Sequence, residues 1–300
     1  MDKVCILLAT YNGGKYISTQ LDSILAQVGV SVDIYISLDV SKDDTLEIIN
    51  DYMGKYENIK LLPYGEKFGS AGKNFFHLIQ NVPFDDYDYV SFSDQDDIWL
   101  DDKLIESVNF MSKHQAHAYS SNVTAFWSDG REKVIVKSAP QVEFDYIFES
   151  AGPGCTFVFS QEAIKSIRGK LKSNIEEQDN LWLHDWFCYS FCRTNGFKWV
   201  IDPVSRMRYR QHSDNVVGAN SGLKSILTRV TSVLSEDAFI KVINQANYLD
   251  QNNKPLKLLR ANDSLSLLKL AFLGGKCRRK SLEKIMFFFA VILFSFKRLF

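Results

Sequence analysis

Short apolar runs alternate with helical spacing along the first hundred residues. Residues 4–9, 32–38, 59–62 and 87–92 form short apolar or β-rich runs, which are typical of strands buried on both faces. Between these runs, apolar spacing predicts one helix near residues 17–28, a second that opens at Asp43-Asp44-Thr45, and a third over residues 73–80. This βαβα order predicts an α/β fold with a mainly parallel sheet and helices on both faces.

Three segments are expected to meet at one edge of this sheet. Open parallel sheets bind ligands at the carboxyl ends of their strands. The first run ends in the glycine turn at residues 10–14, the second ends at Asp39, and the fourth ends at residues 94–97. A ligand site formed by these three strand ends is therefore predicted.

Asp94, Asp96 and Asp97 place three carboxylates within four positions. Like charges this close repel each other unless water or a cation screens them. One interpretation is a solvated turn in which one Asp caps a helix over residues 100–111. The other is a Mg²⁺ or Mn²⁺ site that holds a substrate phosphate. A calcium-binding loop is excluded because the central Gly and terminal Glu of that motif are missing.

The middle of the chain carries a second set of chemically informative residues. Gly152-Pro153-Gly154-Cys155 precedes an apolar run at residues 156–159, and an ionisable pair, His184-Asp185, lies among aromatic residues. Such a pair needs a partner or a function, although a capping or ion-paired structural Asp remains an alternative. His212, in a polar segment, is either a metal ligand or a loop residue.

Composition limits the possible partners and compartments. The chain has 300 residues, 46% of them hydrophobic, and a net charge of −1, so it lacks the basic character of a general nucleic-acid-binding protein. Its five cysteines have no paired CxxC spacing, which favours a reducing cytosol over a zinc or disulfide framework. The N-terminus does not have the pattern of a signal peptide, so export is not expected.

The C-terminal part has a different pattern. Residues 223–234, 238–249 and 256–273 are helix-like, and residues 285–296 form a nearly continuous apolar run that is too short to span a bilayer as a standard helix. Basic residues flank this run: Lys276, Arg278, Arg279, Lys280 and Lys284 before it, and Lys297 and Arg298 after it. The pattern favours a helix that lies in an anionic membrane surface. A helix buried on the protein or in a homodimer is the alternative.

Six motifs in order resemble the inverting, nucleotide-sugar-dependent glycosyltransferases of family 2, and specifically their bacterial rhamnosyltransferase branch. They are ATYNG (9–13), ISLDVSKDDT (36–45), SDQDDIWLDDKL (93–104), GPGCTF (152–157), HDW (184–186) and YRQHSDNVVG (209–218). The resemblance implies a GT-A fold over residues 1–217. The nucleotide-sugar half would span residues 1–110, the acceptor half 111–217, and a helical extension 218–300.

The resemblance also implies a role for individual residues. Asp185 would be the general base, and Asp96 and His212 would bind Mn²⁺ or Mg²⁺. Asp39 would accept a hydrogen bond from the pyrimidine ring, and Asp94 would reach the ribose or the metal. The remaining donor-site residues would be Thr10, Tyr11, Asn12, Lys73 and Gln95. The acceptor site would include Trp99, Gly154, Cys155, His184 and Trp186.

The expected reaction is transfer of L-rhamnose from its thymidine diphosphate to a lipid-linked glycan of bacterial surface polysaccharide, such as O-antigen or capsule, at the cytoplasmic face of the inner membrane. A uridine-diphosphate hexose or N-acetylhexosamine donor and a catalytically silent membrane-bound scaffold are the alternatives. One departure from the family pattern affects nucleotide binding. Leu38-Asp39-Val40-Ser41 replaces the usual Asp-Asp-Gly-Ser, and Val40 does not easily adopt a positive φ.

Overall fold

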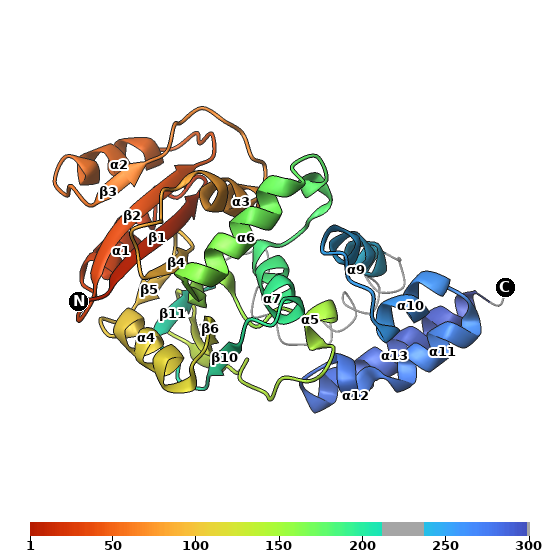
Figure 1. The fold of residues 1–300 in the computed structure, drawn as a ribbon. Coiled ribbons are helices and arrows are strands. Elements are labelled where there is room, and N and C mark those ends of the chain that lie inside the picture. Colours follow the sequence, from red (N-terminus) through yellow and green to blue (C-terminus); the bar gives the residue numbers. More distant parts are fainter. Residues whose placement is uncertain (212–236, 299–300) are drawn as a thin grey trace.

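A mixed sheet forms the centre of this computed structural model, which describes residues 1–211 and 237–298 (Figure 1). Within these residues the strand order is β10-β6-β9-β4-β1-β2-β3. The pairs β1–β2, β1–β4, β2–β3 and β6–β10 are parallel, and β9 runs antiparallel to β4 and β6. The strands are β1 (Lys3–Thr10), β2 (Ser31–Leu38), β3 (Ile59–Leu61), β4 (Tyr89–Ser93), β6 (Ala118–Ser121), β9 (Val158–Ser160) and β10 (Trp199–Asp202).

Helices cover both faces of the sheet, as the alternating pattern predicts. The helices of this part are α1 (Ile17–Leu25), α2 (Thr45–Met53), α3 (Ala71–Asn81), α4 (Lys103–His114), α5 (Asp145–Phe148), α6 (Gln161–Ser173) and α7 (His184–Thr194), with 3₁₀ turns at η1 (Gly154–Thr156) and η2 (Gln178–Asn180). Alternate β1 side chains enter different cores: Leu7 packs with Phe75 of α3, while Ile6 packs with Leu21 of α1. Burial on both faces explains the uninterrupted apolar run of this strand.

A second, smaller sheet was not predicted from the sequence. Its order is β5-β11-β7-β8, from β5 (Ile98–Trp99), β11 (Met207–Arg210), β7 (Val123–Phe126) and β8 (Glu132–Ile135). Because β5 has two residues, it carries no readable periodicity. Its pairing with β11 places the segment that ends at Arg210 beside the Asp94–Asp97 loop. The helix expected from residue 100 begins at Lys103 instead.

The C-terminal helices pack against the middle of the chain. They are α9 (Asp237–Tyr248), α10 (Lys254–Ala261), α11 (Ser264–Phe272), α12 (Gly274–Cys277) and α13 (Ser281–Lys297), drawn in blue beside α5 and α7 in Figure 1. The single helical stretch expected over residues 256–273 is wrong. Asn262 adopts a left-handed φ of 53°, and Asp263 caps α11 by accepting a hydrogen bond from the Ser266 backbone N–H.

One hydrophobic core joins this extension to the middle of the chain. Val291 and Phe294 of α13 belong to the same buried cluster as Ile147 of α5 and Trp186 of α7. The helices of residues 237–298 therefore share a hydrophobic core with α5 and α7. The helix expected over residues 223–234 lies outside the described residues, and within them no helix is both long and apolar enough to cross a membrane.

Candidate active site

Gln95 ties the end of β4 to the turn that follows β1. Its Oε1 accepts hydrogen bonds from the Thr10 hydroxyl at 2.6 Å and from the Tyr11 backbone N–H at 2.8 Å, and its Nε2 donates to the Tyr11 carbonyl at 3.0 Å. Thr10 is buried, whereas the Tyr11 ring is exposed. The two predicted donor segments therefore meet, and Tyr11 is free to contact a flat ring such as a nucleobase.

The turn at Asn12 is held by the loop after β2. Asn12 adopts a left-handed φ of 45°, its backbone N–H donates to Ser41 Oγ at 2.9 Å, and its Oδ1 accepts from the Lys42 N–H at 2.9 Å. Val40, the residue that departs from the family pattern, is not among the described residues with positive φ. The loop therefore accommodates Val40 without left-handed strain, and Ser41 supplies the contact to the first turn.

Asp39 orders the loop that leads into α3. Its Oδ1 accepts a hydrogen bond from the Phe68 N–H at 3.1 Å, and its Oδ2 accepts one from the Gly69 N–H at 2.8 Å. A carboxylate offers about four lone-pair sites, so each oxygen can still accept from a ligand. Lys73, in the first turn of α3, pairs with Asp179 at 2.6 Å, and both side chains are solvent-exposed.

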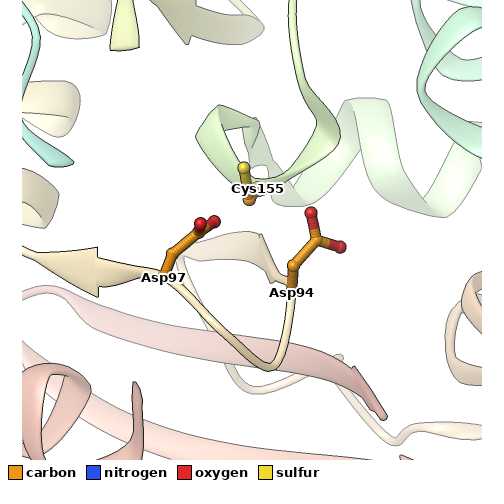
Figure 2. Close-up of side chains that lie close together, drawn as sticks. All are labelled: Asp94, Asp97 and Cys155. Atoms are coloured by element: carbon orange, nitrogen blue, oxygen red, sulfur yellow. The ribbon is translucent and has the colours of Figure 1, made fainter. Parts of the chain in front are cut away.

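Two of the three clustered carboxylates converge on a thiol. Ligand atoms of Asp94, Asp97 and Cys155 lie within 4.8 Å of one another (Figure 2). Burial raises the pKa of Asp94 to about 7, with contributions from Asp96 and Asp185. Burial, with repulsion from Asp96 and Asp94, also raises the pKa of Asp97 well above its ordinary value. Without a cation, this cluster therefore retains protons near neutral pH.

Asp97 and Cys155 are the deepest members of this group, and both are fully buried. Asp97 Oδ1 accepts a hydrogen bond from the Arg210 backbone N–H at 3.1 Å, while Oδ2 is buried and has no hydrogen-bond partner among residues 1–211 and 237–298. Burial, with the nearby Asp97 charge, raises the pKa of Cys155 well above its ordinary value, so its sulfur is a thiol and not a thiolate.

Lys103 lies behind the cluster and was missed by the sequence reasoning. Its ammonium is 3.4 Å from the centre of the Trp99 ring, and both side chains are only 2% exposed. Burial lowers the pKa of Lys103 to about 7, against the opposing effects of Cys155 and Asp97. Trp99, predicted to contact the acceptor, therefore packs beneath the acidic loop and covers a buried lysine.

Asp96 and the segment leading to His212 are adjacent. The Asp96 side chain is 9% exposed, and its backbone carbonyl accepts a hydrogen bond from Arg210 Nε at 2.7 Å. His212 itself lies outside the described residues. The small sheet thus brings the chain to the acidic loop two residues before the predicted ligand.

Asp185 occupies the first turn of α7, where helix dipoles favour negative charge. Its Oδ1 accepts a hydrogen bond from the Trp186 backbone N–H at 2.6 Å. Burial raises the pKa of Asp185 to about 6, opposed by that hydrogen bond and by the charge of Lys137. The effect of Asp185 on the pKa of Asp94 also indicates that the two predicted functional acids lie near each other.

The neighbours of Asp185 along α7 are mainly structural. His184 stacks on Phe75 at 3.9 Å between ring centres, and burial lowers its pKa to about 3, so the ring is neutral. A Cβ on Gly154 would lie 2.4 Å from His184 Nε2, which explains why a glycine stands there. Trp186 is buried, and its indole N–H donates to the Tyr146 carbonyl at 2.9 Å.

Comparison with known proteins gives consistent matches. The family model described as "Glycosyl transferase family 2" matches residues 5–193. The chain is 40% identical to the dTDP-rhamnosyl transferase RfbG of Shigella flexneri over 287 residues, 95% of this chain and 99% of that protein. It is 26% identical to the UDP-Glc:alpha-D-GlcNAc-diphosphoundecaprenol beta-1,3-glucosyltransferase WfaP of Escherichia coli over 189 residues, 61% of this chain and 70% of that protein.

Solved structures resemble the chain over almost its whole length. Staphylococcus aureus TarS 1–349 superposes with a TM-score of 0.55 at 15% identity, covering 99% of this chain and 92% of that one. The mannosyltransferase PcManGT from Pyrobaculum calidifontis, in complex with GDP-Man and Mn²⁺, gives 0.52 at 13% identity, covering 99% and 87%. At these identities the likeness concerns the fold alone.

The raised pKa of Asp94 predicts how stability depends on pH. The folded-state pKa of about 7 exceeds the ordinary value of 3.8, so the stability that this group contributes is present below pH 4 and lost as the pH rises to about 7. Asp94→Asn removes the charge but keeps the shape. We therefore expect the metal-free variant to have a higher free energy of unfolding than metal-free wild type. This difference should grow from pH 4 to about pH 7 and then stay constant, and urea denaturation measures it.

A matched control removes one charge from the surface. Asp51→Asn, on the exposed side of α2, should give no such pH-dependent gain. Mn²⁺ should stabilise wild type more at pH 8 than at pH 5, because protons compete with the metal for the cluster. A gain for Asp94→Asn that is equal at pH 5 and pH 8 would mean that its charge is not buried.

Proposed function

Because the chain belongs to glycosyl transferase family 2, we propose that it is an inverting rhamnosyltransferase that uses dTDP-L-rhamnose as donor. The observation that carries this proposal is the 40% identity to a dTDP-rhamnosyl transferase over nearly the full length of both chains. The described structure has the GT-A arrangement expected from the sequence, and the segments proposed to bind the donor follow the parallel strands β1, β2 and β4.

The donor nucleotide would bind across the three joined strand ends. Asp39 would accept the thymine ring N–H with an oxygen lone pair that the loop at Phe68 and Gly69 leaves unused. The exposed Tyr11 ring would pack against the base or ribose.

Gln95 would fix the distance between this pocket and the acidic loop, since it accepts hydrogen bonds from both Thr10 and Tyr11 in the turn after β1. Asn12 would hold the turn open, and Lys73 would face the sugar nucleotide from α3.

The acidic loop has the chemistry of a divalent-cation site. Asp97 offers a buried carboxylate oxygen without a hydrogen-bond partner, and an Asp94 oxygen lies within 4.8 Å of it. Hard oxygen ligands suit Mn²⁺ or Mg²⁺, whereas the protonated Cys155 is a poor ligand for either. Asp94, Asp96 and Asp97, with His212 from the following segment, would hold the ion. When bound, it supplies positive charge that stabilises the departing diphosphate.

Asp185 would act as the general base. Its pKa of about 6 leaves it ionised at neutral pH yet basic enough to take a proton. The Asp185 carboxylate would remove the proton of the acceptor hydroxyl as that oxygen attacks the anomeric carbon of the donor. The bond from that carbon to the diphosphate oxygen breaks in the same step, and thymidine diphosphate leaves. A single displacement inverts the anomeric configuration, and no covalent sugar–enzyme intermediate forms.

The acceptor would be a lipid-linked glycan presented at the cytoplasmic face of the bacterial inner membrane. Exposed apolar side chains form one outward stripe on α13 at helical spacing: Leu282, Ile285, Phe289, Leu293 and Phe296. Phe272 of α11, three-quarters exposed, extends it, since its ring packs 5.3 Å from that of Phe288. Lys297 and Arg298 are exposed at the end of α13. We call the apolar stripe on α13, together with Phe272, the apolar face.

The apolar face supports peripheral membrane binding with a smaller basic contribution than the sequence suggests. Three of the flanking cations are used inside the protein: Lys276 pairs with Glu143 at 2.8 Å, Arg278 with Glu283 at 3.1 Å, and Arg279 with Glu149 at 3.3 Å. Binding would depend mainly on apolar burial, with Lys297 and Arg298 adding about 1 kcal/mol each on an anionic surface.

Replacing the proposed base tests the mechanism. Asp185→Asn should lower the transfer rate by roughly 10²-fold or more, because the amide keeps the shape but cannot take the proton. Donor affinity, measured by calorimetry, should change little. In wild type, the rate should fall as the pH drops below about 6, where Asp185 becomes protonated. Turnover of the variant within a few-fold of wild type would place the base elsewhere.

The donor proposal is tested by direct comparison of sugar nucleotides. Wild-type enzyme should consume dTDP-L-rhamnose faster than UDP-glucose or UDP-N-acetylglucosamine at equal concentration. Release of the nucleoside diphosphate measures the rate of consumption. Asp185→Asn is the inactive control. Turnover with uridine donors alone would favour the alternative suggested by the glucosyltransferase relative, and no turnover with any donor would favour the silent scaffold.

Charge placed on the apolar face should release the protein from membranes. Ile285→Asp/Phe289→Asp changes side chains that are 54% and 59% exposed, so folding should be preserved. We expect the variant to lose flotation with anionic liposomes. Val28→Asp/Val134→Asp is the control, because both valines are also 54% exposed but lie on other surfaces. If flotation is unchanged and a dimer dissociates in light scattering, the face is a homodimer contact instead.

A further inference from the structure

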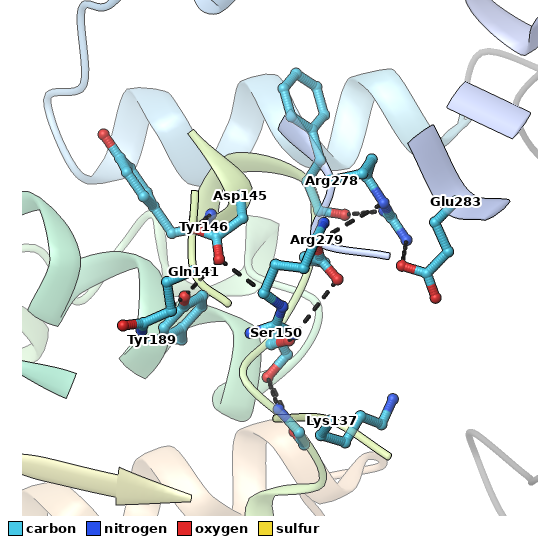
Figure 3. Close-up of polar contacts among 12 residues, drawn as sticks. Lys137, Gln141, Asp145, Tyr146, Ser150, Tyr189, Arg278, Arg279 and Glu283 are labelled. Atoms are coloured by element: carbon cyan, nitrogen blue, oxygen red, sulfur yellow. Dashed lines mark hydrogen bonds and ion pairs between the residues drawn. The ribbon is translucent and has the colours of Figure 1, made fainter. Parts of the chain in front are cut away.

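Arg279 joins the C-terminal extension to the segment before Asp185 (Figure 3). It is 6% exposed, its backbone N–H donates to Glu149 Oε1 at 2.8 Å, and its Nη2 donates to the Ser150 carbonyl at 2.6 Å. The other terminal nitrogen, Nη1, is buried and has no hydrogen-bond acceptor in the part of the chain that the structure describes. A buried guanidinium N–H without an acceptor is costly, so an absent anionic group would satisfy it.

The carboxylates around Arg279 already have partners. Asp145 accepts hydrogen bonds from Arg193 Nη1 at 2.9 Å and from the Tyr189 hydroxyl at 2.8 Å. Glu149 accepts from Arg279, and Glu283 accepts from Arg278 Nη2 at 3.1 Å. Each of these acids is therefore already paired with an arginine, and the remaining cations nearby are not paired directly with them.

Lys137 and Lys280 are those remaining cations. In the described part of the chain, neither ammonium lies within ion-pair distance of a carboxylate. The stem of Lys137 lies across Gly152, where a Cβ would be 3.6 Å from Lys137 Cγ. Burial lowers the pKa of Lys137, and repulsion from Lys280 and Arg279 lowers it further, against the attraction of Glu283 and Glu149. The Lys137 side chain thus lies beside Gly152 with Lys280 and Arg279 near it, and its charge lowers the pKa of Asp185.

We propose that Lys137, Lys280 and Nη1 of Arg279 bind a phosphate of the acceptor's lipid diphosphate, close to the hydroxyl that Asp185 deprotonates. Arginine and lysine are the usual donors to phosphate oxygens. Lys280 immediately precedes α13, so a lipid in contact with the apolar face could reach this site with its head group. The glucosyltransferase relative is named for an acceptor of the same class, a sugar diphosphoundecaprenol. This inference rests on the proposed transfer to a lipid-linked acceptor.

Binding of defined acceptor analogues tests the site. The full-length enzyme, saturated with thymidine diphosphate and Mn²⁺, would be titrated by calorimetry with dodecyl diphospho-N-acetylglucosamine and with neutral dodecyl N-acetylglucosaminide. Wild type should bind the diphosphate at least roughly tenfold more tightly, the scale of a charged hydrogen bond. Lys137→Gln and Lys280→Gln should each remove most of that preference and leave affinity for the neutral glycoside and for thymidine diphosphate unchanged.

Lys133→Gln is the matched control, since Lys133 lies on β8 shortly before Lys137 in the chain but is exposed. If the Lys137 and Lys280 variants lose affinity equally for both analogues, the lysines have a structural role and the proposal is overturned. Unchanged affinity for both analogues would also overturn it. Inorganic diphosphate that binds as tightly as the lipid, through the same lysines, would overturn the assignment to the acceptor. Wild type that binds the lipid diphosphate through these lysines but transfers no rhamnose would instead contradict only the proposed function.

Discussion

Electrostatic repulsion between buried carboxylates is the constraint on which the site depends. Asp94 and Asp97 converge with Cys155 at the end of β4, where burial raises the pKa values of both acids. Such a cluster is stable only with bound protons or with a cation. The surroundings hold it in place against this repulsion: Gln95 ties it to the first turn, Arg210 donates to Asp97, and Trp99 covers Lys103 behind it. These contacts keep the acidic side chains close together despite their mutual repulsion.

A second dependence links α7, the helix that carries Asp185, to the C-terminal helices. Trp186, next to Asp185, belongs to the same core as Phe294 of α13, and Arg279 fixes the segment that contains Asp145 and Ser150. The helices beyond residue 237 therefore support the position of α7. Segments on both sides of residue 217, where the family resemblance implies a boundary, share this core.

The sequence predicts the main sheet well because its strands carry strong local signals. The continuous apolar run of β1 and the helical spacing of α1 reflect burial that is repeated along each element. The small sheet could not be predicted in this way, since β5 comprises Ile98 and Trp99 alone and exists through pairing with a strand more than one hundred residues away. For the site, chain order places Asp39 and Asp94 at the carboxyl ends of β2 and β4, the two strands that flank β1. It does not reveal that Lys103 and Trp99 pack beneath them, because that contact depends on burial.

Helix α13 meets different requirements on its two sides. Ala290, Val291 and Phe294 face the core, whereas Phe289, Leu293 and Phe296 face outward. Each residue turns an α-helix by about 100°, so the two sides stay separate only while the helical phase is kept. A single inserted residue near position 288 would rotate Phe294 toward solvent and bring outward side chains against Trp186. Insertions and deletions in this helix should therefore be far less tolerated than exchanges among apolar residues on its outer side.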